Sequence, residues 1–90
     1  MICHVIGNSM LPTIQPERRL LVRKSWFLCK IEKGNIIVLR DPRTQQLIIK
    51  RVKKKGKKHY FVTGDNPKES TDSNVFGWVE EKNIVGKIIF

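Results

Sequence analysis

Short runs of β-branched and aromatic residues, separated by turn residues, are the feature that most limits the fold of this chain. No stretch carries apolar side chains at the 3.6-residue spacing of a convincing helix. Gly, Pro, Asp and Asn gather in the gaps. The runs are RLLVRK (19–24), NIIVLRD (35–41), QLIIKRVKK (46–54), HYFVTG (59–64), FGWV (76–79) and VGKIIF (85–90). This spacing predicts an all-β domain, a small coiled or closed antiparallel sheet. The segment 79–84 has room for one helical turn at most.

The length of the chain predicts a single domain. Ninety residues that are 40% apolar can bury one modest core. The longest apolar stretches, such as IIVL, are far shorter than a membrane span. Met1 stands too close to the first distinctive motif, around Ser9, to leave room for a leader or an N-terminal anchor. We therefore expect one soluble, cytoplasmic domain over residues 1–90.

Much of the formal charge of +10 is local, because KRVKKKGKK (50–58) holds seven of the eighteen Lys and Arg residues. The plainest interpretation is a solvated hairpin tip that turns at Gly56. Tyr60 and Phe61 are the only nearby rings for base stacking, and no RNA-binding motif accompanies them, so we expect no specific nucleic acid. Weak binding to an anionic surface stays open. It would use Lys53, Lys54, Lys55, Lys57 and Lys58.

Cysteine and histidine give no pattern of metal chemistry. Cys3 and Cys29 are the only cysteines, and neither belongs to a CxxC motif or a Cys/His cluster. His4 and His59 are isolated. We expect no metal and no cofactor.

The stretch GNSMLPTI (7–14) places Ser9 in a shaped turn, because Gly7 tolerates unusual backbone angles and Pro12 fixes φ. Such a serine either hydrogen-bonds its own loop or acts as a nucleophile. A nucleophile needs a base, and neither histidine has a carboxylate partner in its surroundings. Strand alternation places Lys50 on one face with Ile48 and Val52. Burial would lower the Lys50 pKa from its ordinary value of about 10.4 and make the amine a usable base.

Three segments then resemble, in order and spacing, the sequence boxes of the type I signal peptidase family. GNSMLPTI is similar to its nucleophile box, and IIKRV (48–52) to its general-base box. GDNPKESTDSNVFGWV (64–79) resembles its third box, and NIVGKIIF its closing strand. The resemblance implies the coiled-sheet fold of the signal-peptidase catalytic core and a Ser–Lys endopeptidase activity.

The same resemblance implies a role for each site residue. Ser9 would be the nucleophile and Lys50 the general base. Ser70 would orient the Lys50 amine, Asp72 would brace that loop, and Gly7 and Ser9 would flank the oxyanion.

Further residues are expected near this site: Met10, Pro12, Arg51, Asp65 and Asn66. We also expect Asp65 to pair with Arg51 on the opposite face of the strand. Asn74 stands where the family has an arginine, so Asp72 would receive hydrogen bonds rather than a charged partner.

The resemblance extends to short, unanchored maturation proteases of nickel-type superoxide dismutase. This resemblance implies that the partner is a precursor protein whose N-terminal extension binds as an extended strand. One alternative is a leader peptidase core, mitochondrial or bacterial, peripheral at a membrane. Self-cleaving repressor proteases share the dyad and a related fold but lack the third box. A different class, a basic binding module without catalysis, also stays open.

Overall fold

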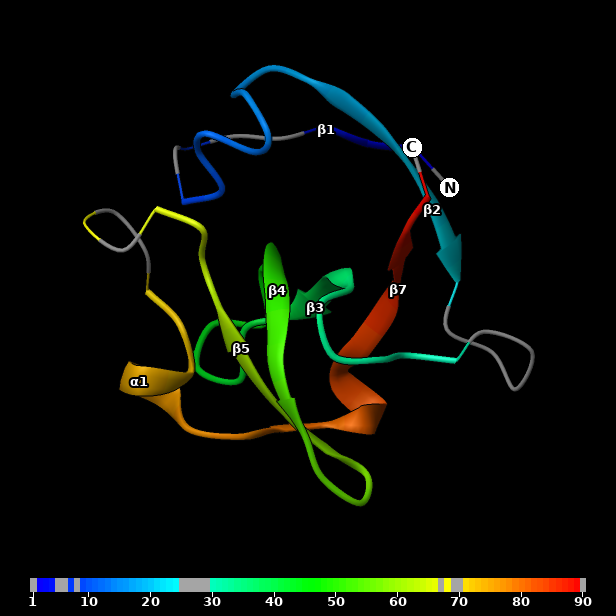
Figure 1. Ribbon diagram of the computed structural model, residues 1–90, viewed down its shortest axis with the longest axis vertical. Coiled ribbons are helices and arrows are strands. Elements are labelled where there is room, and N and C mark those ends of the chain that lie inside the picture. The colour runs from blue at the N-terminus through cyan, green and yellow to red at the C-terminus, as the bar shows by residue number, and fades with distance from the viewer. Residues whose placement is uncertain are drawn as a thin grey trace.

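The computed structural model describes residues 2–4, 7, 9–24, 30–66, 68 and 71–89, with the backbone alone at 2–4 and 24. Within these ranges the chain forms a seven-stranded antiparallel sheet in the order β1-β2-β7-β3-β4-β5-β6. The strands are β1 (Ile2–His4), β2 (Arg19–Lys24), β3 (Ile36–Arg40), β4 (Leu47–Lys55), β5 (His59–Thr63), β6 (Val79–Glu80) and β7 (Ile84–Ile88). In Figure 1, β4 and β5 occupy the middle of the view while β1, β2 and β7 curve around them. The predicted all-β class is confirmed.

Short helical elements also occur, among them α1 (Ser73–Phe76) and the 3₁₀ turn η2 (Glu81–Asn83). The predicted single turn within 79–84 is therefore confirmed. The strand predicted at 76–79 is wrong, because α1 occupies its first position and β6 begins only at Val79. The Asp72 carboxylate accepts the Asn74 N–H at 3.0 Å and caps α1, which favours the helical turn over extended backbone.

The strand β1 was not predicted from the sequence. Its three residues pair with β2, with Cys3 opposite Leu20. A segment this short shows no alternation of its own, so its strand conformation depends on its partner. The other predicted strands are confirmed, with ends that differ by one or two residues.

The core is divided by β3, whose side chains are buried on both faces. Ile36 and Val38 point into one apolar cluster, and Ile37 and Leu39 into the other. The first cluster also contains Met10, Ile14, Leu20, Val22 and Ile88. The second also contains Ile31, Val52, Tyr60, Val62, Val79 and Ile84.

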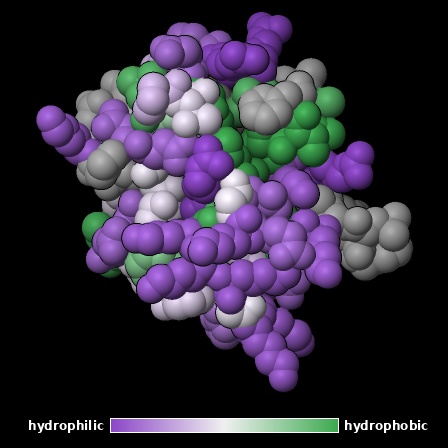
Figure 2. All heavy atoms as spheres, viewed as in Figure 1, coloured by the Kyte–Doolittle hydropathy of each residue, from purple (hydrophilic) through white to green (hydrophobic). Residues whose placement is uncertain are grey.

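The predicted hairpin that turns at Gly56 is confirmed, since β4 pairs with β5 and the Gly56 N–H donates to the His59 carbonyl at 2.8 Å. A bulge between Val52 and Lys54 leaves Lys53 without an opposite residue. Figure 2 shows hydrophilic side chains gathered over the lower half of this face, where the hairpin lies, and apolar atoms in its upper part.

The helical segments in the described part of the chain are too short or too polar to cross a bilayer.

Candidate active site

The turn that carries Ser9 is fixed to the core by its apolar residues. Met10 and Ile14 are each only 2% exposed, and the Ile14 N–H donates to the Met10 carbonyl at 2.9 Å. Ser9 itself is partly exposed. Gly7 is exposed with φ +83°, and a Cβ there would meet no atom within 4 Å. Gly7 is therefore suited to its backbone angle rather than to close packing. The prediction of a shaped turn around Ser9 is confirmed.

Two long-range contacts join this turn to the loop after β5. The Asn66 N–H donates to the Ser9 carbonyl at 2.7 Å. The Thr13 hydroxyl donates to the Asp65 carboxylate at 2.5 Å. Residues from the first and third predicted boxes are thus hydrogen-bonded to each other.

Asp65 also joins the same loop to β4. The Arg51 guanidinium donates to both oxygens of Asp65, from Nε at 2.9 Å and from a terminal nitrogen at 2.8 Å. The other terminal nitrogen of Arg51 donates to the Gly34 carbonyl at 2.8 Å. The predicted pairing of Arg51 with Asp65 is confirmed. It holds the loop against the strand position next to Lys50.

Lys50 is buried within β4. Its side chain lies on the face that β4 shares with Val52, opposite Ile37 of β3, and the residue is 3% exposed. Burial lowers the Lys50 pKa below its ordinary 10.5, because the charged form loses its hydration. The effect agrees with the prediction from strand alternation. A buried amine with a lowered pKa can accept a proton from a hydroxyl.

Two carboxylates oppose this shift. The charges of Asp72 and then Asp41 raise the Lys50 pKa, but less than burial lowers it. Asp41 is itself 5% exposed and accepts two side-chain hydrogen bonds from Arg43, at 3.0 and 3.2 Å. These bonds lower the Asp41 pKa, so its carboxylate stays ionised near Lys50.

Asp72 holds the third predicted box together. One carboxylate oxygen accepts from the Asn74 side chain at 3.1 Å, and the other accepts from the Gly64 N–H at 3.3 Å. The expected replacement of a charged brace by amide hydrogen bonds from Asn74 is confirmed. The next residue, Ser73, is buried and its hydroxyl accepts the Val62 N–H at 2.8 Å. The segment 72–74 is thus bound both to itself and to β5.

The remaining predicted residues divide into two groups. Pro12 is exposed and follows a cis peptide bond after Leu11. Ser70 lies outside the described residues, so its orienting role stays a prediction.

Sequence reasoning missed three residues of this region: Thr13, Asp41 and Ser73. Asp41 is the last residue of the run NIIVLRD, and only its burial sets it apart. Thr13 and Ser73 lie within predicted boxes, but no local pattern shows which distant group each hydroxyl contacts.

An open pocket of about 470 Å³ borders this region on the Arg51 side of the hairpin. Its lining includes Lys33, Lys53 and Thr63 as well as Asp72 and Asn74. No cluster of His, Cys, Asp or Glu suited to a metal ion occurs among the residues that the structure describes.

Residues 1–89 match a protein family described as Peptidase S24-like. The chain is 33% identical, over 106 aligned residues, to mitochondrial inner membrane protease subunit 2 of Schizosaccharomyces pombe, an alignment that covers 92% of this chain and 59% of that protein. It is 53% identical over 34 residues to signal peptidase I of Buchnera aphidicola, which covers 38% of this chain and 11% of that protein. The chain therefore spans less than two thirds of the length of either relative.

Proposed function

Since the chain belongs to the Peptidase S24-like family, we propose that it is a serine endopeptidase of the signal-peptidase type, with a Ser9–Lys50 dyad. Both relatives named above are peptidases by their printed names. The single observation that carries the proposal is the burial of Lys50. A lysine that is 3% exposed in a small domain is costly and needs a reason.

In the proposed reaction, the Ser9 Oγ attacks the scissile carbonyl carbon while the Lys50 amine accepts its proton. The Oγ–C bond forms and the carbonyl oxygen becomes an oxyanion. The intermediate then collapses, the C–N bond breaks, and Lys50 returns the proton to the leaving amine. A water molecule, deprotonated by Lys50, then attacks the acyl carbon; the Oγ–C bond breaks, and Lys50 returns the proton to the Ser9 Oγ.

The surroundings of the dyad support this assignment. The backbone N–H of Ser9, next to the exposed backbone at Gly7, would stabilise the oxyanion. Ser70 would orient the Lys50 amine, and Asp72 would hold the loop through its bonds to Gly64 and Asn74.

For the substrate, the sequence resemblance favours the N-terminal extension of a nickel-type superoxide dismutase precursor, bound as an extended strand. A second candidate is a leader peptide cut at a membrane. The printed name of the fission-yeast relative, an inner membrane protease, favours that one.

The decisive experiment compares protein N-termini in host cells that carry the intact gene, Ser9→Ala, Lys50→Ala or the control Lys30→Ala. Lys30 is a well-exposed lysine, with a side chain that is 83% accessible. We expect a small set of N-termini that disappears with Ser9→Ala and with Lys50→Ala but persists with Lys30→Ala. The new N-termini would identify the precursor and decide between the two substrates.

The opposite result would be the same N-termini in all four strains, with each variant expressed and folded. It would remove the peptidase proposal and favour the basic binding module.

The pH profile of acylation gives an independent test of the base. Because burial lowers the Lys50 pKa, the rate should rise with pH and level off below the ordinary 10.5. A rate that still climbs through 10.5 would mean that Lys50 is not the base in the free enzyme.

A further inference from the structure

A cluster of one lysine and two aromatic rings lies on the β4–β5 hairpin, near its tip. The Lys54 ammonium lies 5.5 Å from the centre of the Phe61 ring. The Phe61 and Trp78 rings meet edge to face, with centres 5.5 Å apart and planes at 68°. Trp78 also lies against the turn, since a Cβ on Gly56 would be 3.5 Å from its ring. Trp78 is nonetheless 47% exposed.

Further lysines that form no ion pair within the described part of the chain lie on the same hairpin as Lys54 and Phe61. Four exposed hairpin lysines form no ion pair with any described residue: Lys53, Lys54, Lys57 and Lys58. Lys55 differs, because it pairs with Glu32 at 3.5 Å. The nearest acidic side chains at the tip are Glu80, which pairs with Lys82 at 3.2 Å, and Glu81, whose N–H donates to the Lys58 carbonyl. We call these four lysines, with Phe61 and Trp78, the hairpin patch.

We propose that the hairpin patch docks on the surface of an anionic lipid bilayer. Lysines on long apolar stems place their ammonium groups among lipid phosphates while the stems stay near the acyl boundary. A half-exposed tryptophan beside them suits the headgroup region, where its ring is partly buried and its N–H stays hydrated.

The same contacts disfavour a nucleic acid as the occupant. Base stacking needs an open ring face. Phe61 is already in contact with two side chains of the patch, because Lys54 lies over its ring and Trp78 meets it edge to face. The charges are lysines rather than arginines, so the bidentate reading of bases or phosphates is absent from the patch.

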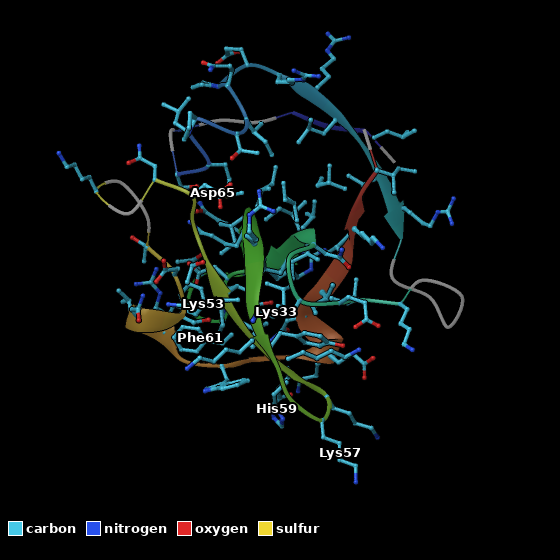
Figure 3. All side chains as sticks on the ribbon, in the orientation of Figure 1. Lys33, Lys53, Lys57, His59, Phe61 and Asp65 are labelled. Carbon is cyan, nitrogen blue, oxygen red and sulfur yellow. The ribbon has the colours of Figure 1, made fainter. Side chains whose placement is uncertain are left out.

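Docking through the tip lysines of the patch, Lys57 and Lys58, would hold the candidate active site away from the bilayer, whereas Lys53 also lines the pocket that borders the site. In Figure 3, Lys57 lies at the lower end of the molecule, Asp65 lies well above it, and Lys53 lies between the two. At 3.3 Å per residue, the path along β4 from Lys50 to Gly56 spans roughly 20 Å. The proposal is therefore separate from the peptidase activity, and either can fail without the other.

The first test is vesicle flotation of the full chain. We expect binding to phosphatidylcholine vesicles that contain a third phosphatidylglycerol, no binding to pure phosphatidylcholine, and release as salt rises from about 0.1 M to about 1 M. The variant Lys57→Glu/Lys58→Glu should weaken binding by at least about 25-fold, since each lysine near such a surface contributes about fivefold.

The matched control is Arg18→Glu/Arg23→Glu, which changes the net charge equally at two exposed residues away from the hairpin. We expect this control to bind within a few-fold of the unchanged protein. Equal losses for both double variants would overturn the proposal, because binding would then follow net charge alone. So would tighter binding to transfer RNA or to polyglutamate than to the anionic vesicles.

Tryptophan fluorescence gives the second test without disturbing the patch. The chain has two tryptophans, so Trp26→Phe leaves Trp78 as the only one. On anionic vesicles its emission should shift to the blue, and brominated lipids should quench it. An unshifted, unquenched emission from protein that floats with the vesicles would overturn the proposal.

Discussion

The side chain of Arg51 links two loops to β4, and its removal should have a large and measurable cost. Arg51→Ala removes two hydrogen bonds to Asp65 and one to the Gly34 carbonyl. Hydrogen bonds to charged groups contribute about 1.5–3 kcal/mol each when buried. The Arg51 side chain is 33% exposed and that of Asp65 16%, so solvent screens much of this energy. We expect a loss of about 2 kcal/mol in the free energy of unfolding, or about 10 °C in Tm.

The assay is urea unfolding of a double-mutant cycle built from Arg51→Ala and Asp65→Ala. The coupling energy should be about 1–2 kcal/mol, because each single variant removes the same bidentate contact. Arg51→Lys should fall between the parent and Arg51→Ala, since lysine keeps the charge but cannot donate in a fork. Turnover should also fall by at least about tenfold, because the Thr13 turn depends on the same carboxylate.

The pH dependence of the free energy of unfolding provides the sharpest check on this reasoning. The Arg51 hydrogen bonds lower the Asp65 pKa below its ordinary 3.8, with Thr13 contributing less. A carboxyl whose pKa is lowered by folding stabilises the protein above its unfolded pKa, and this contribution is lost as the pH falls through the folded value. The difference in free energy of unfolding between the parent and Arg51→Ala should therefore be constant near neutral pH and shrink below pH 3.8. A difference in free energy of unfolding that stays the same in acid would refute this reasoning. So would a coupling energy near zero between Arg51 and Asp65.

Three further substitutions test other parts of the structure. Lys50→Met should raise the free energy of unfolding at pH 7 by about 1 kcal/mol, because it removes a buried charge. This gain should vanish as the pH approaches 10.5, and a gain that persists there would exclude burial of the charge as the cause. Ser73→Ala should lower the free energy of unfolding by about 1–3 kcal/mol, since it leaves the Val62 N–H without its partner. Hydrogen exchange at the Val62 amide should then accelerate selectively, and unchanged exchange would argue against that bond. Gly86→Ala should lower the free energy of unfolding, measured in urea, by about 2 kcal/mol or more, because its Cβ would lie 2.5 Å from the Arg23 carbonyl oxygen. An unchanged free energy of unfolding would mean that β2 and β7 are not packed so closely.

Local patterns predicted much of the fold because they depend on neighbours along the chain. Alternation in 46–54 was enough to place Lys50 on the buried face, and Gly56 was enough to place the hairpin turn. The strand predicted at 76–79 was wrong for a related reason. Its apolar residues suit a strand, but the cap supplied by Asp72 begins a helical turn first.

The sequence by itself determined most of the strands, though not β1, and that a serine turn, a buried lysine and a polar loop occur in a fixed order. Only the tertiary structure decided how they meet. Thr13 and Asp65 are 52 residues apart, and the contact between them exists because the sheet coils. The charge of Asp41 acts on Lys50, and Trp78 lies against the hairpin turn, for the same reason. Periodicity and turn preference are local properties of the backbone, whereas a contact between distant side chains depends on the packing of the whole sheet.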